Sequence, residues 1–211
     1  MQRKHPLWFL LPLALLLPLA ACSGQEPAAG PSQENTVAPY ELTQQESDLL
    51  SAFGLTEDNA LALSFQAPAE AKALFIQVSR LEDGVWENVS DSVSGFGMDG
   101  PQEDLPDSFA GLLCLEENED RSLSVHVQST FGGFANTPQG AAPDLEWTMR
   151  STAFLQEAQT IQLDQPIPVA LLAYDTGTSM SSLDLQSYFT PEDLAGLDLV
   201  QAVTVTFSET L

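Results

Sequence analysis

The stretch "ALFIQVSRLEDGVWENV", residues 73–89, predicts a β-hairpin. In its first half Leu74, Ile76 and Val78 recur at every second position, so they share one face of an extended strand. Asp83 and Gly84 follow, and such a pair tolerates the positive φ angles of a two-residue turn. The hairpin therefore indicates an antiparallel sheet with one buried face.

The same period of two residues continues along most of the chain. Further strands are predicted in "ALALSFQ" (60–66), in a second hairpin (111–130), and in segments 146–154, 159–164, 168–174 and 199–208. The segment "PVALLAY" (168–174) is apolar on both faces, as in a central strand or one covered by a loop. About nine short strands joined by turns predict a mainly β fold, an antiparallel β-sandwich. Immunoglobulin-like and jelly-roll topologies both remain open.

Two short helices interrupt the strands. Near the N-terminus, Thr43 and Glu46 have the spacing of a capping box, and Gly54 is placed to end the helix. One side of this helix is apolar and is expected to pack against another element: Leu49, Leu50 and Phe53. A second helix is predicted in "FTPEDLAG" (189–196), before the last strand, with Thr190 as its N-cap.

The first residues have the pattern of an export signal. Arg3 and Lys4 precede an apolar run over residues 7–20. The run is shorter than the roughly 20 residues that span a bilayer. Pro12 and Pro18 also make it a poor permanent membrane helix. Residues 1–21 are therefore predicted to be a removable signal peptide.

The end of this segment, Leu19-Ala20-Ala21-Cys22, resembles the lipobox of bacterial lipoprotein precursors. The resemblance covers residues 1–22 only, and the body of the chain resembles no family. It implies transfer of a diacylglyceryl group to the sulfur of Cys22 and cleavage before that residue. The chain is then expected to be exported and held at the cell membrane by the acyl chains, facing outside the cytoplasm.

Composition divides the remaining chain into a tether and a body. Residues 22–39 are rich in small and polar residues, with Val37 as the only large apolar side chain, and predict a flexible tether. Residues 40–211 are predicted to form a single acidic β-sandwich domain.

The charge of the chain restricts its partners. All 30 acidic residues but only four of the six basic ones follow residue 21, so the mature chain carries a formal charge of −26. A protein with so few cations is a poor ligand for nucleic acid, which excludes that class of partner. Anionic headgroups also repel it, so its contact with the lipid bilayer is expected to depend on Cys22. The other expected partner is an unknown protein or glycan.

The residues of common catalytic sites are scarce. His126 is the only histidine outside the signal, and the alternation of its strand places it on an exposed sheet face. Cys114 has no partner once Cys22 is acylated, and it is expected to be a small buried hydrophobe. The sequence contains no GxxxxGK[ST], HExxH or GxSxG motif. These observations predict a protein that is not an enzyme. A small glycosidase using two carboxylates is the weakest alternative.

Calcium is the one cofactor that the composition could support, and two acidic loops could bind it. The first loop offers four oxygen ligands between glycines and prolines: Asp99, Glu103, Asp104 and Asp107. The second, "LEENEDR" (115–121), lies at a hairpin tip. Neither has the Asp-x-Asp-x-Asp-Gly spacing of a specific calcium loop, so both are predicted to be solvated turns, with no metal or other cofactor.

Aromatic residues supply the remaining candidates for ligand binding. Phe131 and Phe134 flank two glycines at the start of segment 131–147, which is predicted to be irregular. Two alternatives stay open: the two rings form a binding patch, or they plug the end of the sandwich. A carbohydrate-binding module would instead use Trp86 or Trp147 as a stacking platform. Trp86 is expected to be exposed because Val85 occupies the opposite face of its strand. The sequence thus favours a non-enzymatic interaction module over a carbohydrate-binding module.

Overall fold

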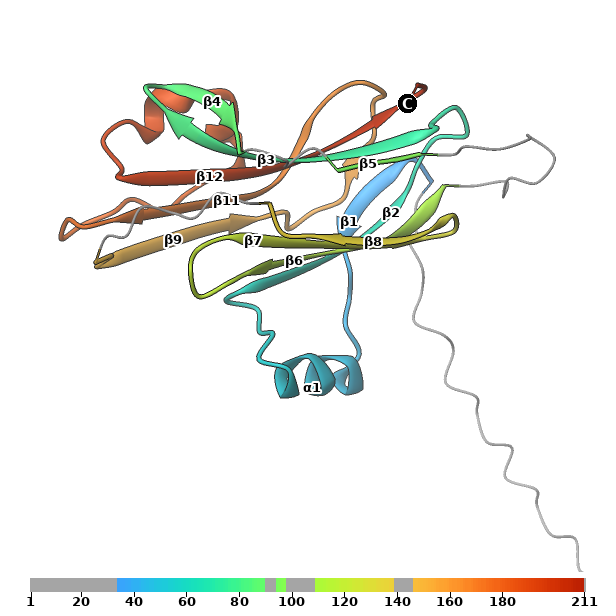
Figure 1. Ribbon diagram of the computed structural model, residues 1–211, viewed down its shortest axis with the longest axis horizontal. Coiled ribbons are helices and arrows are strands. Elements are labelled where there is room, and N and C mark those ends of the chain that lie inside the picture. Colours follow the sequence, from blue (N-terminus) through green and yellow to red (C-terminus); the bar gives the residue numbers. More distant parts are fainter. Residues whose placement is uncertain (1–33, 90–93, 98–108, 139–145, 211) are drawn as a thin grey trace, which may run out of the picture.

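A computed structural model of the chain describes residues 34–89, 94–97, 109–138 and 146–210. Two antiparallel sheets lie face to face in it, with helix α1 (Gln44–Ala52) outside one of them (Figure 1). The predicted β-sandwich is therefore confirmed. Within the described residues, no helix has the length and apolar character needed to cross a membrane.

Each sheet is built mainly from antiparallel hairpins. Sheet A has the order β10 (Gln159–Thr160), β1 (Thr36–Pro39), β2 (Ala60–Gln66), β6 (Ala110–Glu117), β7 (Leu123–Ser129) and β8 (Gly132–Asn136). Sheet B has the order β4 (Val85–Asn88), β3 (Ala73–Glu82), β12 (Leu199–Ser208), β11 (Ile167–Asp175) and β9 (Met149–Phe154). A short strand, β5 (Ser94–Gly97), also pairs with β3.

Both predicted hairpins are present. In the first, β3 pairs with β4, and Asp83 and Gly84 have φ angles of 50° and 80°. Only residues that tolerate the left-handed region fit such a turn without strain. In the second, β6 pairs with β7 from Gly111 opposite Ser129 to Glu117 opposite Leu123. Local turn chemistry therefore sets the register in the first hairpin, and the alternating pattern sets the buried face in both.

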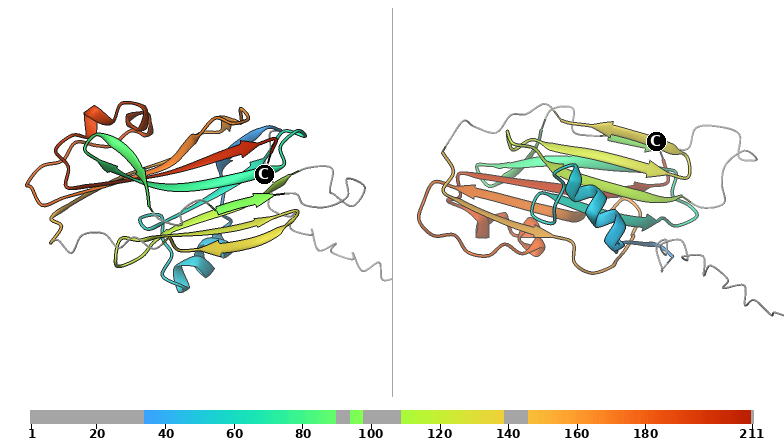
Figure 2. Two further views of the ribbon diagram at one scale, coloured as in Figure 1. Left: turned by 45° about the horizontal axis from the view of Figure 1, so that its top comes forward. Right: turned by 90° about the horizontal axis from the view of Figure 1, so that it is seen from below.

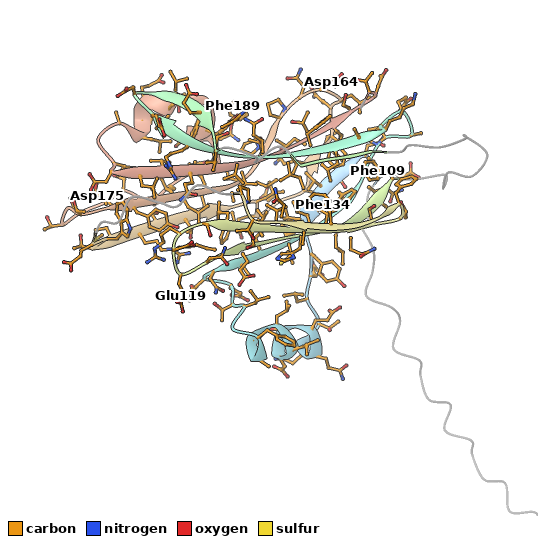
Figure 3. All side chains as sticks on the ribbon, in the orientation of Figure 1. Phe109, Glu119, Phe134, Asp164, Asp175 and Phe189 are labelled. Carbon is orange, nitrogen blue, oxygen red and sulfur yellow. The ribbon has the colours of Figure 1, made fainter. Side chains whose placement is uncertain are left out.

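The main core lies between the sheets. Its apolar side chains come from alternate positions of both layers, such as Leu63 in β2, Ile76 in β3 and Val203 in β12. At one end Phe65 packs against Phe109 and Phe207, with ring centroids 5.6 and 5.4 Å apart. Figure 3 shows Phe109 at this end and Glu119 at the other.

A second, smaller core covers the outer face of sheet B. Two 3-10 helices, η2 (Leu185–Phe189) and η3 (Pro191–Leu194), precede β12, and Leu194 packs with Leu171 and Val200. This layer explains why β11 is apolar on both faces: it is a central strand and is also covered. The second short helix predicted at 189–196 is present as the 3-10 helix η3 with Thr190 at its N-cap position, but the Thr190 side chain makes no cap bond to the backbone and donates instead to Asp193.

Three predicted boundaries also need correction. Residues 36–39, assigned to the tether, form β1, and Val37 is only 1% exposed in the core. Segment 131–147 is not wholly irregular, because residues 132–136 form β8 on β7. In segment 159–164 only two residues pair as β10. Each error concerns a short or edge strand. Such a strand forms because it pairs with neighbouring strands in the sheet, and its own composition does not indicate this pairing.

Candidate interaction surface

The first candidate, Trp86, does not have a free ring face. Its indole stacks on Tyr188 of η2 with centroids 5.2 Å apart, and its Nε1 donates a 2.9 Å hydrogen bond to the Tyr188 carbonyl. Val85 on the opposite face is instead 58% exposed. Trp86 therefore lies on the outer side of sheet B, opposite Val85 and Val89 as predicted, but its expected exposure is wrong because η2 and η3 cover that side and the indole packs in their layer.

The other aromatic candidates belong to the core or its edges. Trp147 packs against Tyr174, with centroids 5.7 Å apart, and Phe131 packs against Phe109 at 5.2 Å. Phe134 lies on β8 and is partly buried against the same core. The four aromatic candidates thus lie on separate elements and do not converge on one surface.

The proposed ligands of the first acidic loop, Asp99, Glu103, Asp104 and Asp107, lie outside the described residues, and so does Cys22. In the part of the chain that the structure describes, no three His, Cys, Asp or Glu side chains are grouped to hold a metal ion.

The second acidic loop is not simply a solvated turn. The side chain of Glu117 is only 3% exposed, and its carboxylate pairs with Arg121, at 2.7 Å, and with Arg150 of β9. The guanidinium of Arg121 also lies 5.3 Å from the centroid of the buried Tyr174 ring, and burial, followed by the Glu117 charge, raises the pKa of this tyrosine. The sequence offered one signal for this cluster, the i,i+4 spacing of Glu117 and Arg121.

This ion-pair cluster joins the two sheets at one end of the sandwich. Glu117 ends β6 in sheet A, whereas Arg150 and Tyr174 are paired residues in sheet B. The amide of Gln201 in β12 adds a 3.1 Å hydrogen bond to the Arg121 carbonyl. The cluster is therefore a structural link between the sheets, and the carboxylate of Glu117 is already paired with two arginines.

The outer face of sheet A carries the two residues that resembled catalytic groups. His126 is exposed there, as predicted, on the same strand face as Gln128. Cys114 is only half-buried, so its assignment to the core is wrong: it points outward, whereas its neighbours Leu113 and Leu115 point inward. Burial, with a smaller effect of Glu116, nevertheless raises the pKa of the Cys114 thiol.

Helix α1 crosses this outer face of sheet A (Figure 2, right). None of its nine residues is buried. Leu49 is 59% exposed and Phe53, which caps the helix, is 75% exposed, while Leu42 before the helix is 38% exposed. The predicted helix is confirmed, but its apolar side does not pack against the core as expected.

Local hydrogen bonds, rather than core packing, define the ends of α1. The Glu46 N–H donates to the Thr43 hydroxyl, and the Thr43 N–H donates to the Glu46 carboxylate at 2.8 Å, as the predicted capping box requires. These bonds lower the pKa of Glu46. At the other end Gly54 has a φ of 83°, and its carbonyl accepts a bond from Asn59. The helix is thus formed without burying its apolar residues.

A hollow separates α1 from sheet A. It has a volume of about 360 Å³ and is lined by Leu50 and Leu55 on the helix side and by Ala60, Ala62 and Cys114 on the sheet side. The small side chains of Ala60 and Ala62 in β2 leave space between the sheet and the helix. This volume is within the range of roughly 300–1,000 Å³ found for ligand pockets.

Two further hollows adjoin the first. One lies on the Tyr40 side of α1 and shares Leu42, Ala60 and Ala62 with the first hollow. The other begins at Cys114 and crosses β7 to Gly133 of β8. The three hollows together are called the α1 trough below. Leu42 lines two of them, whereas the exposed Leu49 and Phe53 are on a different side of the helix segment from the residues that line the trough.

The chain around the α1 trough is negatively charged. Residues 40–60 contain no lysine or arginine and five acidic residues: Glu41, Glu46, Asp48, Glu57 and Asp58. The nearby Arg150 donates to the Asp58 carbonyl and is paired with Glu117. The site therefore combines exposed apolar side chains and a hollow with an acidic surround, a pattern typical of surfaces that bind another molecule.

No protein-family model matches the chain, and the comparisons with curated proteins and with solved structures found no match either.

Proposed function

We propose that this protein is a lipoprotein held outside the cytoplasm by an acylated Cys22, and that it acts as a non-enzymatic module binding another protein through α1 and the α1 trough. One observation carries the interaction role: Leu49 and Phe53 are exposed on a helix of which no residue is buried. Exposed apolar residues grouped on one helix mark protein contacts more often than single scattered ones, and the α1 trough lies under another side of the same helix.

The anchor in this proposal rests on residues 1–22, with their basic start, short apolar run and lipobox-like end. The tether is then residues 23–35, because the first strand begins at Thr36. Such a protein meets partners that are themselves in or near the membrane, where anchoring raises the effective concentration of a weak binding surface.

The non-enzymatic role is supported by where the few reactive side chains lie. His126 lies opposite Cys114 on neighbouring strands, on the open outer face of sheet A. The thiol of Cys114 has a raised pKa, which keeps it protonated and weakly nucleophilic near neutral pH. The carbohydrate-binding alternative is weakened because the Trp86 ring already stacks on Tyr188.

Site-specific photo-crosslinking in the producing cells tests the interaction surface. A photoreactive amino acid placed at Phe53 is expected to give a discrete crosslinked protein band, because this side chain contacts the partner. The matched position is Val85, which is also largely exposed but lies on sheet B. Equal crosslinking from both positions, or none from Phe53, would contradict the proposal.

A further inference from the structure

We infer that the partner segment seated in the α1 trough is a basic amphipathic polypeptide, with bulky apolar side chains in the hollow and lysine or arginine around it. This inference rests on the proposed function and names the chemistry of its partner.

The apolar part of the α1 trough is ready to accept large side chains. Its floor is formed by Ala60 and Ala62, and Leu50 and Leu55 line it from above. A bulky residue of the partner would fill the hollow between these layers and would cover Leu42, which is 38% exposed and lines the first hollow. Burying one such side chain is worth at most about 1.5–3 kcal/mol, before the costs of association.

The negative charge around the α1 trough favours a positively charged partner. Asp48, Glu57 and Asp58 are exposed next to the trough. Arg150, the basic residue whose contacts reach this segment, is engaged by Glu117 and by the Asp58 carbonyl. Among the residues that the structure describes, none of these three carboxylates is in an ion pair, although Asp48 accepts a hydrogen bond from Gln44. Lysine or arginine on the partner would therefore meet carboxylates without a counter-charge, which favours encounter and orientation.

Charge and side-chain composition disfavour three other occupants. A second copy of this chain would bring the same acidic residues opposite one another, with −26 on each mature chain. A bilayer containing anionic lipids would repel this face. The chain's own residues 23–33 contain no large apolar side chain and include Glu26, so they offer nothing for the hollow.

The inference is tested with model peptides and the mature chain, residues 22–211, carrying Cys22→Ser. The probe is a fluorescent 14-residue peptide of leucine and lysine in an amphipathic helical pattern, and its partner peptide has glutamate in place of lysine. Fluorescence anisotropy is expected to show binding of the lysine peptide and none of the glutamate peptide. Since Cys114 lines the hollow, maleimide labelling of this single remaining thiol should slow when the lysine peptide is bound.

Matched variants separate specific seating from general attraction to an acidic protein. Leu42→Ala with Leu50→Ala removes two side chains that line the first hollow and is expected to weaken binding of the lysine peptide at least tenfold. Val85→Ala with Phe189→Ala removes two apolar side chains, 58% and 56% exposed, from sheet B and its outer layer and should change the affinity less than twofold. These four substitutions leave the net charge unchanged.

A second matched pair tests the acidic surround. Asp48→Asn with Glu57→Gln is expected to weaken binding more than Glu192→Gln with Asp193→Asn, which removes the same charge from η3. Equal losses from both pairs, with unchanged Cys114 labelling, would overturn the inference. So would stronger binding to phosphatidylcholine vesicles than to the lysine peptide. If the lysine peptide fails to bind while Phe53 still crosslinks to a protein in cells, the inference falls and the proposed function stands.

Discussion

Glu117→Gln is expected to lower the free energy of unfolding by about 2–4 kcal/mol. The carboxylate is 3% exposed and pairs with both Arg121 and Arg150, so its loss leaves two guanidinium groups close together without a counter-charge. Breaking a fully buried pair costs about 3–5 kcal/mol, and the expected effect is smaller because both arginines are about one-third exposed. Urea denaturation followed by tryptophan fluorescence measures the change.

Glu119→Gln supplies the control for this prediction. It removes the same charge from the same hairpin tip, but Glu119 is exposed (Figure 3). Its effect on stability should stay within about 0.5 kcal/mol, as for most surface substitutions. If the two variants unfold at the same urea concentration, the cluster does not link the sheets as described.

Phe65→Ala is expected to be the most destabilising of the substitutions considered, by about 3–5 kcal/mol. Phe65 is 1% exposed on β2, and its ring meets Phe109 from the start of β6 and Phe207 from β12. Its removal would therefore leave a cavity where the two sheets meet. Thermal or urea unfolding of the purified variant provides the measurement.

Phe53→Ala is the matched change at an exposed site. With 75% of this residue exposed, its loss should alter the free energy of unfolding by no more than about 0.5 kcal/mol. Crosslinking from this position to a partner in cells is the matching functional readout. A large loss of stability in Phe53→Ala would mean that this ring serves the fold and would remove the main argument for an interaction surface.

Much of the fold could be predicted because the strands carry strong local signals. The alternation of Leu74, Ile76 and Val78, and the turn at Asp83 and Gly84, depend on neighbours in the sequence only. The strand β1 had no such signal. Val37 is its one large apolar residue, and pairing with β2 on one side and β10 on the other places it in the core.

Errors in side-chain placement arose where an element had an unforeseen neighbour. The expected exposure of Trp86 assumed one covered face for sheet B, but η2 covers the second face and Tyr188 meets the indole. Glu117 looked like one acid among several at a turn, yet its partner Arg150 is 33 residues away in the sequence. Alternation predicts which side chains share a face, but it does not show what lies opposite that face.

The candidate surface illustrates the same limit. The sequence predicted α1 from its capping box and showed an apolar side with Leu49 and Phe53. An amphipathic pattern is the same whether its apolar side meets the protein's own core or another molecule. Only the position of α1 outside sheet A shows that its apolar side does not meet the protein's own core. This position makes α1 and the α1 trough, rather than the aromatic candidates, the better interaction surface.

The membrane anchor at Cys22 underlies the proposed localisation and the kind of partner expected. Mass spectrometry of the protein purified from membranes of its own cells tests it most directly. The account predicts an N-terminal peptide that begins at Cys22, carries a thioether-linked diacylglyceryl group and lacks residues 1–21. A mature chain that retains Met1, or one with an unmodified thiol at position 22, would contradict it.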